Sequence, residues 1–179
     1  MIIAKNMPHN TTLFYLEDLP GYEVSGNSND VRGWTLKDSN HHKIGKVTNL
    51  VVSRKDELVK YLEVKFDQEM IDANPQRLNP QFKSDTPEEF TEGKGKYYFL
   101  LPVGLADLNE DEKTVYVDSI DKETFRTTEK RTKSEPIEPQ YELNVVAHFT
   151  GTKAGYDHVK QVDHRFYDQS TFRNKKFSH

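Results

Sequence analysis

The hydrophobic pattern of residues 30–66 predicts three β-strands joined by two tight turns. In the last of the three runs, apolar residues alternate with Glu63 and Lys65, which is the period of a half-buried strand with its charges on the solvent face. The middle run changes phase partway through residues 44–52, which indicates a β-bulge or a sharp bend. Bends of this kind are typical of small barrels.

Shorter elements are predicted on either side of this stretch. The apolar run at 12–16 predicts a short helix or strand. The nearly continuous apolar run at 97–103 predicts a strand buried on both sides, which Pro102 restricts to a strand end or a sheet edge. Residues 114–117 predict a further strand. The acidic residues 107–112 before it begin like a calcium-binding loop but do not complete its pattern, so we expect them to form a hairpin turn instead.

The sequence also predicts where the main domain ends. Residues 121–131 are expected to form a short helix, and the stiff segment containing Pro136 and Pro139 follows it. We therefore expect a domain over 1–133 and a C-terminal extension over 134–179, which docks on the first domain or on a partner.

A long polar excursion separates the strands at the centre of the chain. Residues 67–94 contain three prolines and few candidate core residues, and a loop of this length usually has structure or a role of its own. Thr86 followed by a proline and two glutamates matches a helix start. A lid, a partner-binding flap or a small-ligand pocket beneath this excursion is one functional alternative.

Several short motifs carry a resemblance to a known family. They are Asp30, Gly33 and Trp34, a turn led by Asp38, the run from Ile44 to Val47, the run from Leu50 to Val52, and the run from Leu100 to Val103. Together they resemble the PRC-barrel family, which is known from the cytoplasmic domain of the photosynthetic reaction-centre H subunit and from a ribosome-maturation factor. The resemblance implies a mainly β fold, a small PRC-like barrel with short helices, and a role in docking or assembly.

One position departs from the family pattern. Family members usually have glycine in the turn where this chain has His41. The neighbouring Asn40 tolerates the left-handed backbone conformation, so we expect the turn to be kept.

Composition narrows the class of protein. The chain has no cysteine, so disulfides and thiolate metal sites are excluded, and no apolar run approaches the length of a membrane span. We expect a cytoplasmic protein. The net charge of -4 argues against nonspecific binding of nucleic acid. Two basic clusters are expected to form solvated surfaces: Arg126, Lys130, Arg131 and Lys133, and further on Arg173, Lys175 and Lys176.

The sequence contains no local signature of catalysis. No nucleophile motif, phosphate-binding glycine loop or dinucleotide fingerprint occurs, so we expect no enzyme activity and no cofactor. Three histidines fall near the C-terminus, at His148, His158 and His164, but their spacing suits no zinc site. His41 and His42 are adjacent and would point to opposite faces of a strand.

We therefore predict a noncatalytic interaction or assembly module that associates with itself or with another protein. The candidate interaction surface comprises the sole tryptophan and four aromatic residues of the extension: Trp34, Tyr156, Phe166, Tyr167 and Phe172. One alternative is a factor associated with ribosomes or RNA processing, which would need a basic face. The other is a small-ligand-binding protein that uses the 67–94 excursion.

Overall fold

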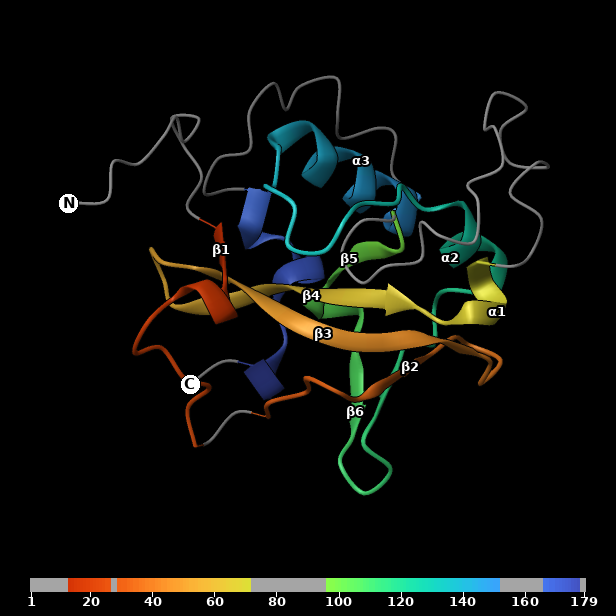
Figure 1. Ribbon diagram of the computed structural model, residues 1–179, viewed down its shortest axis with the longest axis horizontal. Coiled ribbons are helices and arrows are strands. Elements are labelled where there is room, and N and C mark those ends of the chain that lie inside the picture. Colours follow the sequence, from red (N-terminus) through yellow and green to blue (C-terminus); the bar gives the residue numbers. More distant parts are fainter. Residues whose placement is uncertain (1–12, 27–28, 72–95, 152–165, 178–179) are drawn as a thin grey trace, which may run out of the picture.

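A seven-stranded mixed sheet forms the centre of the protein (Figure 1). The computed structural model describes residues 13–26, 29–71, 96–151 and 166–177. The strands follow the order β5-β4-β3-β2-β7-β6, and β1 pairs with β3 beside this path. Their bounds are β1 Leu13–Tyr15, β2 Thr35–Lys37, β3 Lys43–Ser53, β4 Leu58–Phe66, β5 Tyr98–Pro102, β6 Asp107–Asn109 and β7 Thr114–Tyr116.

The helices are short and have clear sequence signals at their ends. The Asp121 side chain accepts a hydrogen bond from the Thr124 backbone N–H and so caps α2, and Gly151 ends α3 in the left-handed conformation. The α-helices are α1 Gln68–Ile71, α2 Lys122–Thr127 and α3 Pro139–Thr150. The 3₁₀ helices are Leu16–Asp18, Val103–Leu105, Phe166–Asp168, Ser170–Phe172 and Lys175–Phe177.

The central prediction of three strands is confirmed, with β2, β3 and β4 pairing antiparallel in sequence order. The β3–β4 register shifts between Val47 and Asn49 and again between Val51 and Val52, which confirms the predicted irregularity in the middle run. The acidic segment forms the β6–β7 hairpin as predicted. Strand β5 is buried at every position and ends at Pro102.

The prediction that β4 is half-buried is wrong. Glu63 has no exposed surface, although the alternating pattern places it on the solvent face. The segment around Ser134 covers this face of β4, and the Ser134 backbone N–H donates to Glu63 Oε1 at 2.6 Å. A buried carboxylate is tolerated there because the fold supplies donors to it.

The sheet is not a closed barrel. The strand order runs from β5 to β6, and these two strands do not pair with each other within the described residues. The 3₁₀ turn at Val103–Leu105 joins them, and the single bridge of Tyr98 to Arg131 lies on the β5 edge. The coarser prediction of a sheet-rich fold is confirmed.

One predicted helix is shorter than expected, and the expected turn at Asp38 is kept with a different residue in the left-handed conformation. Helix α2 ends at Thr127, well before residue 131, because Arg131 is drawn into a bridge with β5. At the turn led by Asp38, His41 itself takes the left-handed conformation, with a φ of 64°. The Asp38 carboxylate accepts bonds from the backbone N–H groups of Asn40 and His42, and these contacts hold the turn.

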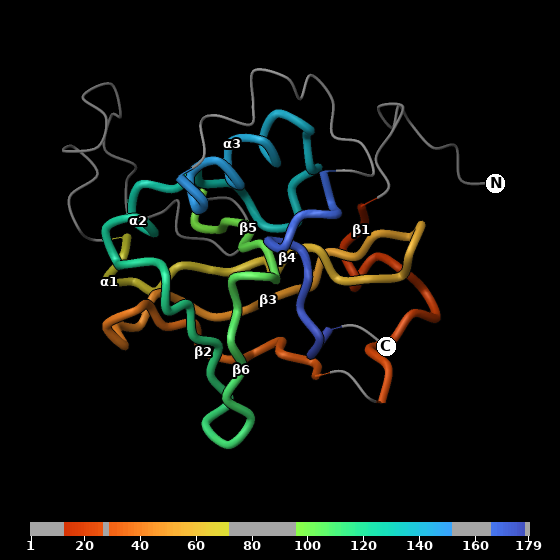
Figure 2. Tube along the Cα trace, turned by 180° about the vertical axis from the view of Figure 1, so that it is seen from behind, coloured from red at the N-terminus to blue at the C-terminus, as the bar shows by residue number. Residues whose placement is uncertain are grey.

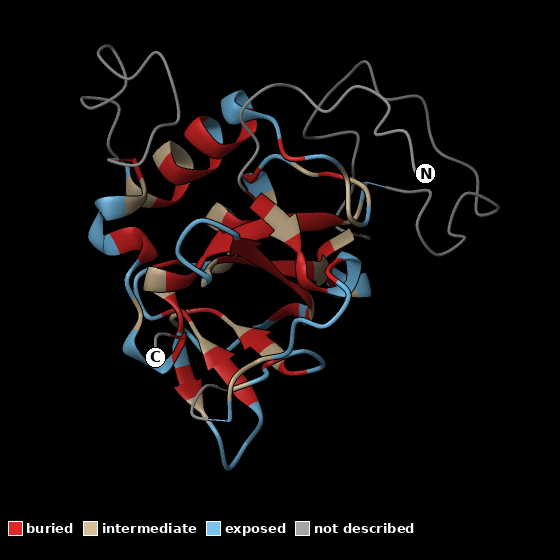
Figure 3. Ribbon diagram, turned by 90° about the vertical axis from the view of Figure 1, so that its left-hand side faces the viewer, coloured by how far each residue is buried: buried red, intermediate tan, exposed pale blue. Residues whose placement is uncertain are grey.

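Residues on both sides of the predicted boundary at 133/134 share one hydrophobic core. Helix α3 lies over the sheet (Figure 1), with Phe149 packed against Phe99 of β5 and Phe125 of α2. Buried residues occupy most of the strands at the centre of the molecule (Figure 3). The segment 166–177 adds three buried phenylalanines to the same core. The described part of 134–179 therefore packs on the sheet.

Replacing Gly45 should destabilise the protein by about 1–3 kcal/mol, because a Cβ there would overlap the backbone carbonyl of Lys65 on the neighbouring strand. Gly45→Ala can be measured by urea unfolding. Gly26→Ala is the matched control: its Cβ would meet no atom within 4 Å, and it should change the free energy of unfolding by less than about 1 kcal/mol. Equal effects of the two substitutions would contradict the tight β3–β4 crossing.

Candidate functional site

The β6–β7 hairpin projects from the body of the protein (Figures 1 and 2). Its turn is held by side chains of its own: the Glu112 backbone N–H donates to Asn109 Oδ1 at 3.1 Å, and Tyr116 Oη donates to Glu112 Oε2 at 2.6 Å. Lys113 takes the left-handed conformation that closes the turn. The hairpin therefore presents a fixed group of acidic side chains to solvent.

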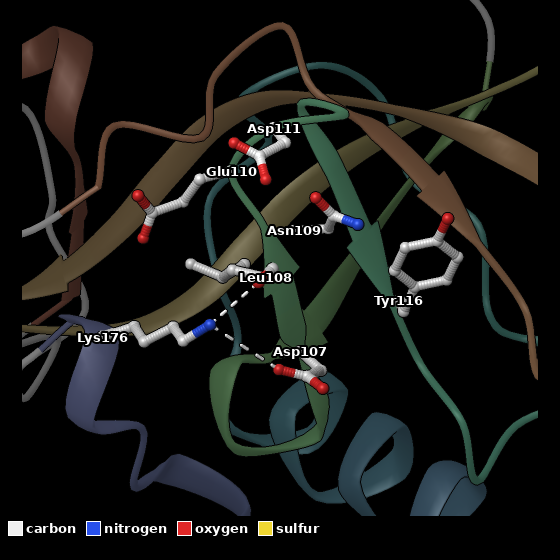
Figure 4. Close-up of a pocket in the computed structure, with 7 residues that line it drawn as sticks. All are labelled: Asp107, Leu108, Asn109, Glu110, Asp111, Tyr116 and Lys176. Atoms are coloured by element: carbon white, nitrogen blue, oxygen red, sulfur yellow. Dashed lines mark hydrogen bonds and ion pairs between the residues drawn. The ribbon is translucent and has the colours of Figure 1, made fainter.

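A polar depression of about 480 Å³ lies beside this hairpin (Figure 4). Lys176, from the C-terminal segment, donates to the Leu108 carbonyl at 2.8 Å and lies 3.8 Å from Asp107 Oδ1. The lysine thus covers an edge carbonyl of β6, which is a common way to protect a strand edge. The lining residues are Asp107, Leu108, Asn109, Glu110, Asp111, Tyr116 and Lys176.

Acidic and basic groups meet at this depression, where Lys176 lies among the acidic side chains of the hairpin. Glu110 and Asp111 are exposed on the hairpin, and Arg173 and Lys175 are exposed on the adjoining C-terminal segment. Lys176 joins the two groups through its contacts with β6. The chemistry of this surface favours an ionic partner that carries both signs of charge. We call it the hairpin face and define it by these five residues.

A second polar cluster is buried between helix α3, β4 and the C-terminal segment. Glu142 is 4% exposed, and its Oε1 accepts hydrogen bonds from Tyr61 Oη at 3.0 Å and from Tyr167 Oη at 2.6 Å. Desolvation raises the pKa of Glu142 to about 7, although the two hydroxyls and Arg131 act in the opposite direction. This carboxyl therefore titrates near neutral pH.

A third polar cluster surrounds Arg131, which is 3% exposed. Its Nη2 donates to Tyr15 Oη at 2.9 Å and to the carbonyls of Glu135 and Pro136. The guanidinium lies over the Tyr141 ring, 4.5 Å from its centroid. Arg131 thus fastens β1 and helix α3 to the segment that leads into this helix.

The expectation that the basic residues around Arg131 form a solvated surface is therefore wrong for Arg131. Lys130 is half-buried, and its Nζ lies 5.2 Å from the centroid of the Phe66 ring. Burial lowers the pKa of Lys130, and Arg126 adds to this effect. Short basic runs are usually solvated, but here the chain crosses the edge of the sheet at Arg131, and this side chain is buried as a result.

The structure places four of the five predicted interaction residues. Trp34, Phe166 and Phe172 are buried and Tyr167 is half-buried, while Tyr156 lies outside the described residues. Phe166, Tyr167 and Phe172 contact one another with ring centroids 5.2 Å apart, and Trp34 lies apart from them beneath Lys113. These side chains pack within the chain itself, so their role in binding a partner stays a prediction.

The other candidates from the sequence are placed only in part. His148 lies on α3, and its Nε2 is 2.7 Å from the Thr124 carbonyl, while His158 and His164 lie outside the described residues. Among the described residues, no group of three or more potential ligands is arranged to hold a metal ion. Of the 67–94 excursion, only residues 67–71 are described, so the predicted helix start at Thr86 and the predicted ligand pocket are not placed.

Sequence reasoning missed several buried charges, among them Glu63, Arg131 and Glu142. The alternating pattern assigns such residues to solvent, since a charge is rarely buried without partners. Their partners come from segments far away in the chain, for example Ser134 for Glu63. The only local signal was the position of Glu142 inside the apolar run 141–149.

No protein-family model matches the chain, and a comparison with curated proteins finds no match. The resemblance to the PRC-barrel family therefore stays a prediction. Within the described ranges, no helix is both long enough and apolar enough to cross a membrane.

Removing the Arg131 guanidinium should destabilise the protein by at least about 2 kcal/mol, because the buried Tyr15 hydroxyl and two part-buried carbonyls lose their donor. Arg131→Met keeps most of the volume, and thermal or urea unfolding measures the loss. Arg32→Met is the matched control, since Arg32 forms an exposed pair with Asp30 and should contribute less than about 1 kcal/mol. A loss at Arg131 no larger than at Arg32 would contradict the role of Arg131 as a fastener.

Proposed function

We propose that the protein is a noncatalytic interaction module that self-associates through the hairpin face. The observation that carries this proposal is the contact that Lys176 makes with the acidic hairpin, on a C-terminal segment that carries further exposed bases. In a two-fold contact, each copy presents the same surface to the other. The acidic hairpin of one copy then faces the basic segment of its partner.

The rest of the described surface supports a polar contact. Among the described residues, the one large hydrophobic side chain that is exposed is Tyr22, at 38%. The described residues therefore offer no large apolar patch for a contact, whereas they carry both the acidic and the basic groups that an ionic contact needs. The mixture of charges also argues against the alternative of RNA binding, which needs a continuous cationic field.

The structural role of the buried polar groups supports the noncatalytic part of the proposal. Glu63, Arg131 and Glu142 each make a hydrogen bond to a segment distant in the sequence, so these groups serve to hold the fold. The resemblance to the PRC-barrel family supports the same role, because that family implies docking or assembly. We propose on this basis that the sheet is a divergent, open form of the PRC barrel.

The predicted boundary suggests a truncation after Lys133, but that truncation would remove buried core residues such as Tyr141 and Phe172. Charge-swap variants of the full chain test the proposal instead. We expect light scattering at low salt to give at least twice the monomer mass for the wild type. Glu110→Lys with Asp111→Lys should lower this mass to that of the monomer, as should Arg173→Glu with Lys175→Glu, because each pair opposes like charges.

All four substitutions together should restore the oligomer, since the charges are then exchanged across the contact. Glu69→Lys with Glu138→Lys is the matched control: these exposed acids lie on α1 and at the start of α3, away from the hairpin, and the same change of charge should leave the mass unaltered. High salt should dissociate the wild type. A monomeric wild type at low salt, or no restoration by the combined variant, would refute self-association through this face.

A further inference from the structure

Glu142 joins three parts of the fold that are far apart in sequence. It lies on α3, and its Oε1 receives one hydroxyl from β4, at Tyr61, and one from the C-terminal segment, at Tyr167. Burial raises the pKa of both tyrosines far above the ordinary value, so both remain donors at neutral pH. The carboxyl is thus the polar contact between the segment 166–177 and the body of the protein at this point.

Among the described residues, no charged side chain forms an ion pair with the Glu142 carboxyl, because the nearby cations bond to other groups. On β4, Lys60 pairs with Asp56 at 2.7 Å, and its Nζ lies 5.5 Å from the centroid of the Tyr167 ring. Arg131 interacts with Glu142 electrostatically but makes its hydrogen bonds elsewhere. The titratable and charged groups facing the contact are Asp56, Lys60, Tyr61, Arg131, Tyr141 and Tyr167.

Apolar and backbone contacts dock the rest of the segment. Phe172 packs edge-on against Tyr61, with centroids 5.2 Å apart. The Asn174 amide donates to the carbonyls of Val103 and Ala106, at 2.9 and 2.8 Å. The backbone of Ser170–Thr171 lies so close to Gly104 that a Cβ there would overlap it. The segment is therefore a docked strap, and the Glu142 contact is one of its anchors.

We propose that Glu142 is a proton-controlled latch that holds the strap 166–177 on the sheet when its carboxyl is protonated and weakens this hold when it ionises. The geometry makes the carboxyl the point where a proton acts on docking, because Tyr167 of the strap lies directly against it. Release of the strap would return the carboxyl toward water. The docked state therefore favours the neutral form.

The direction of the pH effect follows from linkage. In the folded protein, desolvation raises the pKa of Glu142 to about 7 from its ordinary value of 4.5. The latch requires that the strap supplies part of this desolvation, so that the docked state binds the proton more tightly than an open state does. The contribution to docking is complete below pH 4.5 and is lost as the pH rises through 7. Each unit of pKa difference between the two states changes the docking equilibrium tenfold.

The latch would also regulate self-association through the hairpin face, an inference that rests on the proposed function. Arg173, Lys175 and Lys176 belong to the strap, so opening the strap carries the basic half of the face away from the acidic hairpin. Self-association should then weaken as the pH rises toward 8.

Hydrogen exchange measured by mass spectrometry on peptides from 166–177 tests the latch without reference to function. After correction for intrinsic exchange rates, the opening constant of the wild type should rise about tenfold from pH 5.5 to 7.5. Glu142→Gln keeps a carbonyl acceptor for the tyrosines but cannot ionise, so its opening constant should stay constant within about twofold. The same pH response in both proteins, or greater protection at high pH, would overturn the proposal.

Tyr167→Phe provides a second test that keeps the ring packing. Loss of the hydroxyl removes a donor that lowers the pKa of Glu142, so the midpoint of the opening titration should move to higher pH. An unchanged midpoint would overturn the latch even if Glu142→Gln failed to fold. Light scattering at the same pH values separates the two proposals: a pH-dependent strap in a protein that stays monomeric supports the latch and refutes self-association.

Discussion

The fold depends on hydrogen bonds to the charged side chains that it buries. Glu63 in the middle of β4 has no exposed surface, and the covering segment reaches it with the Ser134 backbone N–H while Thr48 donates from β3. Burial raises the pKa of Glu63, and these hydrogen bonds oppose the shift. Without such donors a buried carboxylate is expensive. The position of residues 131–136 over β4 is therefore a condition for the sheet to form as it does.

The same constraint organises the C-terminal half of the chain. Arg131, Glu142 and the tyrosines around them connect β1, β4, α3 and the strap, and the apolar packing of Phe99, Phe125 and Phe149 fills the space between. Polar contacts decide where each segment sits, because a hydrogen bond has a narrow geometry, while the apolar contacts supply most of the free energy. The two kinds of contact together make one core from segments on either side of residue 133.

The strap connects this buried network to the surface. Tyr167 at one end of it contacts Glu142, and Lys176 at the other end contacts the β6 edge beside the acidic hairpin. Under the proposed latch, ionisation of Glu142 weakens the docking of this segment and so moves the basic residues of the hairpin face. In this view, the buried polar groups set the arrangement of charges that a partner would meet.

The sequence by itself determined the local elements: the three strands from residue 35 to 66, the irregularity in β3, the acidic hairpin and a short helix after residue 121 are all readable from periodicity and turn chemistry. It could not place Glu63, Arg131 or Glu142, nor show that the aromatic residues Phe166 and Phe172 face inward. Local periodicity records which side of a strand a residue is on but not what covers that side. Only the tertiary structure decided that, because the covering segments lie 71 residues from Glu63 and 25 from Glu142 along the chain.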